Sequence, residues 1–255
     1  MPVVDLNADL GESFGNFDLG QDRVLIPLLN SAHLACGFHA GDPRVMDETV
    51  RLCRDAGVQI GAHPAFPDLV GFGRRVMDVT GLEAETDIVY QLGALEGFCR
   101  RNGAELAHVK AHGALYNQAA RDAGIARNVL LAIQAATGGA ELVVFVPPGS
   151  AMWQEAKALG MRVAREGFVD RAYEPDGTLR SRTLAGALLT NPAQAAGQAL
   201  SFVRDGGVTC SDGTFLRLAV DTICLHGDTP GAPEIARAVR DALRKAKVKV
   251  VSFRA

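Results

Sequence analysis

Four histidines follow short apolar runs at points where the chain is expected to turn. They are His39 in ACGFHAGDP, His63 in IGAHP, His112 in KAHG and His226 in CLHGD, and each precedes Gly, Pro or Asp within three residues. These residue types form turns directly after strands. Imidazole exchanges protons near neutral pH and also binds divalent metals. Because no H-E-x-x-H or C-x-x-C spacing accompanies the four, proton transfer is our first hypothesis and metal binding the second.

Charged side chains accompany these histidines. Asp9 and Glu12 follow the first apolar run, and Asp228 comes two residues after the last of the four histidines. Lys110 lies two residues before His112, so the two side chains would share one face of a strand. An inward lysine is costly unless it meets an anion, which favours a phosphate or carboxylate partner. The alternative is a lysine whose ammonium reaches the solvent at the rim.

Two further segments offer weaker candidates. The loop GFGRR carries Arg74 and Arg75, which could clamp a carboxylate or a phosphate, but a solvated loop fits this sequence equally well. Asp170 and Arg171 are adjacent and could form a structural pair. Neither G-x-x-x-x-G-K-[ST] nor G-x-G-x-x-G occurs, so the spacing alone indicates no nucleotide site.

The elements that would position these residues alternate along the chain. Short apolar runs predict strands at 3–7, 32–36, 58–62, 106–111, 142–146, 162–168, 217–225 and 248–253. Apolar residues at helical spacing predict helices at 43–56, 88–101, 114–136, 150–159, 192–205 and 232–246. Asp42 and Pro43 are typical of a helix start, and Gly57 is typical of a helix end.

This alternation predicts an α/β fold. With 255 residues and no linker, the chain fits a single (β/α)-barrel domain over residues 1–255, with seven or eight mostly parallel strands. A doubly wound open sheet is the alternative. In both architectures the carboxyl ends of the strands meet at one rim, so the four imidazoles should converge there. His33 and His108 lie inside strands, where core or hydrogen-bonding roles are expected.

Composition narrows the class of protein. The net charge is −3 with acids and bases interspersed, so there is no basic stripe for nucleic acid. No apolar run approaches the roughly 20 residues of a membrane helix, and Asp5 and Asp9 lie where a signal peptide would be apolar. Five cysteines without a C-x-x-C pair predict mostly buried, reduced thiols. We therefore predict a cytoplasmic protein with no nucleic-acid or membrane partner.

Six stretches together resemble the serial motifs of the LamB/YcsF family. They are DLNADLGESFG, ACGFHAGDP, IGAHPAFPDLVGFGRR, VKAHGALYN, EGFVDRAYEPDGTL and ICLHGDTP, in the family's order, from residue 3 to about residue 230. The chain departs at Ala8, His33, Ala65 and Ala111, where the family usually has Cys, Asn, Gly and Pro. None of these departures removes a charged group or one of the four histidines at the rim.

The resemblance implies a barrel like those of the glycoside hydrolases and deacetylases. It implies ATP-dependent cleavage of 5-oxo-L-proline (pyroglutamate) to L-glutamate by a three-component 5-oxoprolinase, with 5-oxoprolinase subunits B and C as partners. ATP would be a co-substrate, Mg²⁺ could accompany it, and no tightly bound cofactor is expected. A lactam is a tethered amine and acid, and because tethering favours ring closure, ring opening needs a driving reaction.

The motifs and the rim argument together give the predicted site. We predict catalytic roles for His112, His39, His63, Asp9 and Lys110. We predict substrate or phosphate binding by Asn7, Glu12, Arg74, Arg75, Asn117, Asp170, Arg171, His226 and Asp228. As the base that activates water we place His112 first and His39 second. The alternative functions are a metal-dependent deacetylase or amidase acting alone and a non-catalytic binding component.

Overall fold

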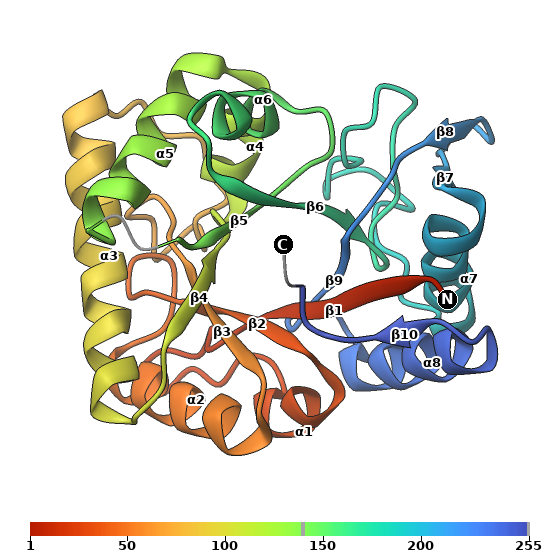
Figure 1. The fold of residues 1–255 in the computed structure, drawn as a ribbon, viewed down its shortest axis with the longest axis horizontal. Coiled ribbons are helices and arrows are strands. Elements are labelled where there is room, and N and C mark those ends of the chain that lie inside the picture. Colours follow the sequence, from red (N-terminus) through yellow and green to blue (C-terminus); the bar gives the residue numbers. More distant parts are fainter. Residues whose placement is uncertain (139–140, 254–255) are drawn as a thin grey trace.

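Seven parallel strands form a closed barrel in the computed structural model, which describes residues 1–138 and 141–253 (Figure 1). Around the ring they are β1 (Val3–Leu10), β2 (Ser31–Ala35), β3 (Gln59–His63), β4 (Leu106–Val109), β5 (Val143–Val146), β6 (Arg162–Phe168) and β9 (Thr222–His226). Pairing of β1 with β9, which sets Asp9 opposite His226, closes the ring. This closure confirms the predicted barrel and excludes the open sheet.

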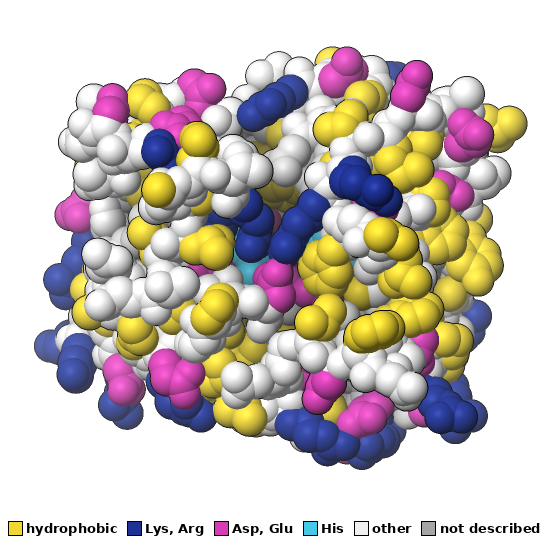
Figure 2. Space-filling model, turned by 180° about the vertical axis from the view of Figure 1, so that it is seen from behind, with side chains coloured by type: hydrophobic (Ala, Val, Ile, Leu, Met, Phe, Trp, Pro, Cys, Tyr) yellow, Lys and Arg dark blue, Asp and Glu magenta, His cyan; other side chains and the backbone are white. Residues whose placement is uncertain are grey.

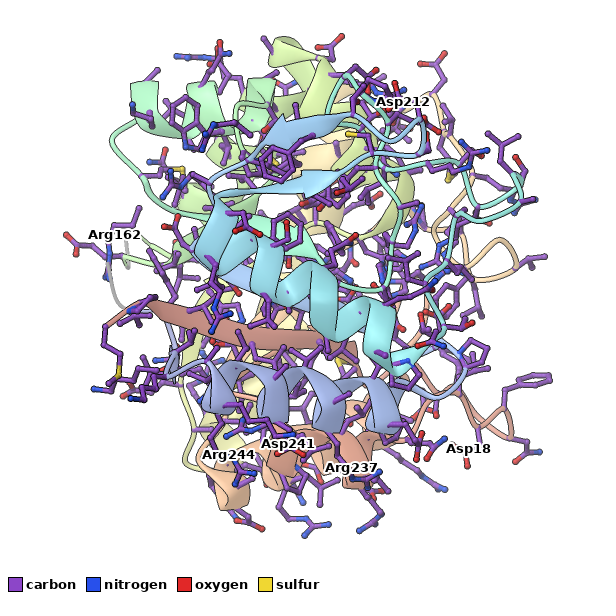
Figure 3. The ribbon with its side chains drawn as sticks, turned by 90° about the vertical axis from the view of Figure 1, so that its right-hand side faces the viewer. Asp18, Arg162, Asp212, Arg237, Asp241 and Arg244 are labelled. Carbon is purple, nitrogen blue, oxygen red and sulfur yellow. The ribbon has the colours of Figure 1, made fainter. Side chains whose placement is uncertain are left out.

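Helices cover the outside of the barrel (Figure 1). They are α1 (Asp22–Leu25), α2 (Pro43–Ala56), α3 (Gly81–Arg101), α4 (Gly113–Arg121), α5 (Ala123–Ala136), α6 (Ala151–Ala158), α7 (Pro192–Leu200) and α8 (Ala232–Lys245). On one side α7 and α8 pack against each other, and α8 carries the charged residues Arg237, Asp241 and Arg244 (Figure 3). Over the described ranges, no helix has both the length and the apolar character needed to cross a membrane.

The start and end of α2 follow from local signals in the sequence. The Asp42 carboxylate accepts hydrogen bonds from the backbone N–H groups of Arg44 and Val45, at 2.8 and 3.2 Å. Pro43 occupies the first helical position, where no N–H is needed. Gly57 ends the helix with a φ of 69°, which favours glycine. Both predicted limits of this helix are confirmed.

Four predicted elements differ from those observed, and one of them is α3, which begins at Gly81 rather than at residue 88. The strand predicted at 217–225 is wrong in its first half. Arg217 is the last residue of β8 (Phe215–Arg217), which pairs antiparallel with β7 (Gly207–Thr209) outside the barrel, and residues 218–221 belong to no strand. The helical region at 114–136 is two helices, since Asp122 separates them and caps the second by accepting from Ile125 N–H at 3.0 Å. Of the strand predicted at 248–253, β10 contains only Lys249–Val250, which pairs with the first residues of β1.

Polar side chains occupy much of the barrel interior. The alternate residues Asp5, Asn7 and Asp9 of β1 face the inside of the barrel, where Asp5 and Asn7 bond to side chains of the neighbouring strands β2 and β9 and Asp9 pairs with Lys110, which follows β4. Leu6 and Leu10, on the other face of the same strand, belong to the apolar core beneath the helices. The barrel therefore positions charged groups rather than enclosing a purely apolar centre.

His33 and His108 lie within this interior, as predicted for histidines inside strands. His33 Nε2 lies 3.1 Å from the side-chain oxygen of Asn7, and its ring meets that of His108 edge to face at 4.7 Å. The His108 ring stacks on Phe145 at 4.6 Å. A Cβ atom at Gly61 would lie 2.1 Å from the His108 ring, so a glycine in β3 makes room for this imidazole.

Candidate functional site

The carboxyl ends of the barrel strands surround a hollow on the face opposite to that of Figure 1. Figure 2 shows histidine at the floor of this hollow, with acidic and basic side chains around it. His63 is the last residue of β3 and His226 the last of β9, while His39 and His112 follow β2 and β4 closely. The predicted convergence of side chains from distant parts of the sequence at one rim is therefore observed.

Lys110 is a buried cation between two carboxylates. Its Nζ lies 2.6 Å from Asp9 Oδ1 and 3.1 Å from Glu166 Oε1, and it also contacts Cys224 Sγ at 3.3 Å. Burial disfavours the ammonium, but attraction to Asp9, Cys224 and Glu166 outweighs it and raises the pKa of Lys110 well above its usual value. The anion that an inward lysine requires is thus supplied by the chain itself.

Asp9 stays ionised for the same electrostatic reason. Burial alone would raise the pKa of Asp9, but the nearby His63 and Lys110 hold it well below its usual range. Asp9 Oδ2 lies 3.2 Å from His63 Nε2, so this carboxylate joins the lysine to the histidines.

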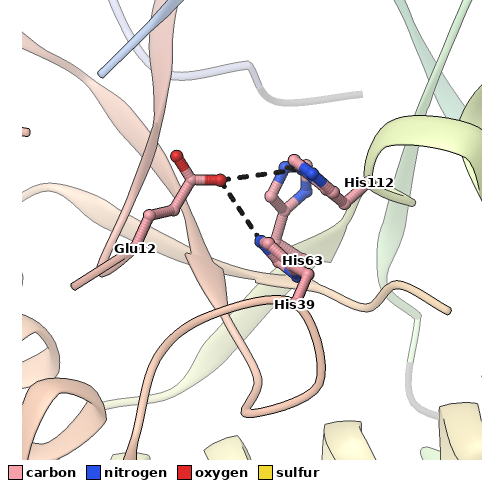
Figure 4. A group of neighbouring side chains, drawn as sticks. All are labelled: Glu12, His39, His63 and His112. Carbon is pink, nitrogen blue, oxygen red and sulfur yellow. Dashed lines mark hydrogen bonds and ion pairs between the residues drawn. The ribbon is translucent and has the colours of Figure 1, made fainter. Parts of the chain in front are cut away.

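Glu12, His39, His63 and His112 form a buried cluster (Figure 4). Glu12 Oε1 lies 3.2 Å from His39 Nε2 and 3.6 Å from His112 Nδ1. His112 Nδ1 lies 2.9 Å from His63 Nε2, and the rings of His39 and His112 stack at 3.8 Å. The donor atoms of these four residues all lie within 4.8 Å of one another, so the set could hold a metal ion.

Burial sets the charge state of this cluster. It lowers the pKa of His39 and of His112 well below 6.5, and the neighbouring histidines lower both further. Burial and the negative charges of Asp9 and Asp228 raise the pKa of Glu12 well above its usual value. Both histidines are therefore neutral at pH 7, which leaves each ring one nitrogen with a free electron pair.

Two backbone carbonyls orient the rings. His63 Nδ1 lies 2.8 Å from the carbonyl oxygen of Lys110, and His112 Nε2 lies 2.9 Å from that of Phe72. The Phe72 carbonyl belongs to the loop that follows β3, and Phe72 has a φ of 55°, which is uncommon for a residue other than glycine. This strained residue thus lies directly against the cluster.

Gly73 brings the same loop against the histidines. Its φ is 64°, and a Cβ atom there would lie 2.8 Å from His112 Cδ2 and 2.9 Å from His39 Cβ. The Gly73 carbonyl accepts from Ala114 N–H at 2.8 Å, which ties the loop to the start of α4. The loop GFGRR (residues 71–75), which we considered as an anion clamp, therefore also covers the cluster.

His226 belongs to a neighbouring group on the same rim. Its Nδ1 lies 3.0 Å from Asp170, and Asp170 also accepts from His226 N–H and from the Thr229 hydroxyl at 2.9 and 2.7 Å. These bonds and the nearby His226 outweigh burial and lower the pKa of Asp170 to about 2. The His226 ring stacks on Phe168, and Lys110 Nζ lies 5.4 Å from the centre of the Phe168 ring.

Arginines lie at the mouth of the hollow. Arg74 Nη2 contacts Asp228 Oδ2 at 2.6 Å, and its guanidinium lies over the Phe72 ring at 4.7 Å. Arg182 approaches the other oxygen of Asp228 at 3.9 Å. Burial and the nearby Arg74 lower the pKa of Arg182 from its usual value. Arg182 comes from the excursion after β6 (residues 169–191). We did not predict Arg182 as a site residue, because no motif marks it.

Three of the predicted residues are exposed or have their partners outside the cleft. Arg75 pairs with Asp68, and its side chain is 66% exposed. Asn117 is exposed on α4. Arg171 donates to the backbone carbonyls of Ala187 and Arg180, so it holds the excursion after β6 rather than pairing with its neighbour Asp170.

Glu166, Thr222 and Cys224 are interior residues that the motif search missed. Glu166 contacts Lys110 and also accepts from the Tyr116 hydroxyl at 3.1 Å. Thr222 joins Asn7 to Asp5, at 2.7 and 2.5 Å. The sequence signal for these residues was the polar or small side chain at every second position of β6 and β9, because alternate residues of a strand lie on the same face.

Known proteins resemble this chain in sequence and in overall structure. The sequence matches the LamB/YcsF family over residues 4–255. A protein of Methylococcus capsulatus, named as the A subunit of 5-oxoprolinase, is 51% identical over 98% of this chain and 96% of its own length. The crystal structure of a lactam utilization protein from Thermus thermophilus superposes with a TM-score of 0.92 at 48% identity, covering 98% of this chain and all of the other.

A more distant structural neighbour bears on the fold alone. A polysaccharide deacetylase from Bacillus cereus has a TM-score of 0.50 at 12% identity and covers the whole of this chain and 93% of its own. The expected likeness to the deacetylase barrels is therefore confirmed as a likeness of fold. At this identity it does not favour deacetylation as the reaction.

Proposed function

The chain belongs to the LamB/YcsF family, and on that premise we propose that it is the A subunit of an ATP-dependent 5-oxoprolinase. The reaction would cleave 5-oxo-L-proline to L-glutamate with hydrolysis of ATP, in the cytoplasm. The observation that carries the proposal is the identity of about half of the residues, over nearly the full length, to relatives named as the A subunit of 5-oxoprolinase. Since these relatives are named as one component of a larger enzyme, we propose subunits B and C as partners.

The chemistry of the ring explains why ATP is needed. Transfer of the γ-phosphoryl group to the amide oxygen would make the ring carbon electrophilic. One water adds to that carbon, and the C–N bond breaks as a proton reaches the leaving nitrogen, which gives an acyl phosphate. A second water hydrolyses this intermediate to glutamate and phosphate. The site then needs a group that activates water and cations that accept phosphoryl or carboxylate charge.

The buried cluster meets the first need. Neutral His39 and His112, together with Glu12, direct electron pairs toward one region of the cleft. We place the attacking water there, with His112 as the leading candidate for the residue that activates it. Lys110 holds Asp9, and Asp9 would fix the position of His63 beside it.

The arginines at the mouth meet the second need. We assign Arg74 to the carboxylate of the substrate or to the transferred phosphate, because its guanidinium already binds an anion, the Asp228 carboxylate, at 2.6 Å. Asp170 and His226 would line the adjacent wall. Mg²⁺ would enter with the nucleotide.

An assay of glutamate release tests the function. The purified chain should release glutamate from 5-oxo-L-proline only when ATP and both partners are present. Omitting ATP or either partner should abolish the release. Glutamate release by the isolated chain without ATP would overturn the proposal and would favour a stand-alone amidase.

A further inference from the structure

The rings of His63 and His112 face each other in a way that neutral rings alone do not explain. A backbone carbonyl can only accept a hydrogen bond. His63 Nδ1 and His112 Nε2 each lie against such a carbonyl, at 2.8 and 2.9 Å, so each of these nitrogens carries the ring proton. The other nitrogens, His63 Nε2 and His112 Nδ1, therefore both present electron pairs, yet they are only 2.9 Å apart.

The surrounding groups add further electron-pair donors. Asp9 Oδ2 lies 3.2 Å from His63 Nε2, and Glu12 Oε1 lies 3.6 Å from His112 Nδ1. A single shared proton could remove the repulsion between electron pairs at only one of these contacts, because an N–H points to one acceptor at a time. A cation at their centre would relieve all of them together.

The local charge also favours a cation. On the floor of the cleft, the carboxylates of Asp9, Glu12 and Glu166 are buried beside one ammonium, that of Lys110. When the cation displaces any proton on Glu12, three carboxylates and one ammonium leave two negative charges. A divalent ion would balance these two charges where the solvent cannot.

The spacing of the donor atoms matches a coordination sphere. Ligand atoms about 2.1 Å from a tetrahedral zinc ion lie about 3.4 Å from one another. Three neighbouring pairs in the cluster are separated by 2.9, 3.6 and 3.2 Å: His63 Nε2 to His112 Nδ1, His112 Nδ1 to Glu12 Oε1, and Glu12 Oε1 to His39 Nε2. Histidines that bind metal usually donate their other N–H to a carbonyl or carboxylate, as His63 and His112 do here.

We propose that Glu12, His63 and His112, with His39 as a fourth donor, bind a divalent cation of the zinc type. Imidazole-rich sites suit zinc and its first-row neighbours, whereas Mg²⁺ prefers oxygen ligands. Such an ion, when bound, would lower the pKa of a coordinated water. The inference stands apart from the 5-oxoprolinase activity, because cation binding is measured on the isolated chain without substrate.

Calorimetric titration of the untagged, chelator-treated chain with Zn²⁺ or Mg²⁺ tests the site. We expect one Zn²⁺ per chain and no saturable binding of Mg²⁺. Glu12→Gln, His63→Gln and His112→Gln should each raise the Kd for Zn²⁺ by more than the roughly 10–100-fold that loss of an outer-shell contact costs. His226→Gln removes a histidine of the same cleft outside the cluster, so it should bind Zn²⁺ like the wild type.

Co²⁺ gives a second readout that does not depend on affinity. Its visible spectrum should report nitrogen and oxygen ligands without thiolate, and the bands should change in His63→Gln and His112→Gln but not in His226→Gln. Saturable binding that survives loss of these cluster residues would overturn the proposal. So would the absence of saturable Zn²⁺ binding, and ¹⁵N spectra that then show His63 as an imidazolium at neutral pH would place a proton where the cation was proposed.

Discussion

At the scale of single residues, the floor of the cleft depends on Lys110 as the internal partner of two buried carboxylates. Its side chain is 2% exposed, and it contacts Asp9 and Glu166 directly. Removing one partner of a buried ion pair leaves uncompensated charge, which costs more than the pair itself contributes. Lys110 is therefore a structural as well as an electrostatic requirement of the site.

Lys110→Met should lower the free energy of unfolding by about 3–5 kcal/mol, because it leaves Asp9 and Glu166 buried without a cation. Arg165→Met is the matched control, since Arg165 pairs with Asp221 but is 37% exposed. A half-exposed pair of this kind should cost no more than about 1 kcal/mol. Urea unfolding at pH 7 measures both values, and equal losses would contradict our description of Lys110. Turnover of Lys110→Met in the complete complex should fall at least about tenfold.

His112→Gln should reduce ATP-coupled glutamate release by at least about 100-fold, the lower range of what a group that activates water contributes. The reason is that both nitrogens of His112 are used, one toward Phe72 and one toward His63 and Glu12. His39→Gln should lose less, since His39 approaches Glu12 alone through Nε2. Initial rates in the complete complex check both, with melting temperatures as the control for folding. A larger loss in His39→Gln would transfer the leading role to that residue.

At the scale of elements, the loop after β3 determines how tightly the cluster is enclosed. Gly73→Ala should abolish most of the activity, because the added Cβ meets His112 and His39 at 2.8 and 2.9 Å. Gly57→Ala is the matched control, since Gly57 has a similar φ of 69° but no atom within 4 Å of the added Cβ. Each substitution should lower the free energy of unfolding by about 1–2 kcal/mol, because alanine is less stable than glycine at a positive φ. Only Gly73→Ala should change the rate, and equal rates would show that the loop does not confine the histidines.

The elements themselves were largely predictable from the sequence, since local signals specify them. Asp42, Pro43 and Gly57 predicted both limits of α2, and apolar runs predicted each barrel strand at least in part. The prediction failed at residues 217–221, because Arg217 belongs to β8, which pairs with β7 instead of the barrel, and β9 begins only at Thr222. Partner choice of this kind depends on packing that no local pattern encodes.

The site was predictable where it lies next to turns and less so inside the barrel. His39, His63 and His112 were found because each precedes a turn residue at the end of an apolar run. Glu166 was missed because it lies within β6, where nothing in the local sequence shows that Lys110 is its partner 56 residues away. Arg75 shows the opposite error. Its loop motif predicted that it binds a carboxylate or phosphate of the substrate, but it pairs with Asp68 of the same chain.

At the scale of the whole molecule, one barrel interior connects the cleft to the opposite end of the strands. Asp5 lies at that far end, where its carboxylate accepts from the hydroxyls of Ser31 and Thr222 at 2.8 and 2.5 Å. Burial raises the pKa of Asp5 from 3.8 to about 7, against the opposing effect of these hydrogen bonds. Ionisation of Asp5 therefore destabilises the far end of the barrel, whereas the charged groups at the cleft are paired with one another.

The folded protein should consequently become less stable as pH rises through the range in which Asp5 ionises. Because the pKa in the folded state is above the unfolded value, the contribution to stability is complete below about pH 4 and is lost as pH rises through about 7. Between pH 5 and pH 8 this loss should amount to about 2–3 kcal/mol, from about 1.4 kcal/mol for each pKa unit. Asp5→Asn cannot ionise, so relative to the wild type it should gain stability by that amount over the same interval. Urea unfolding of both proteins at pH 5 and pH 8 checks the difference, and parallel pH dependences would show that Asp5 is already ionised in the folded barrel at pH 5.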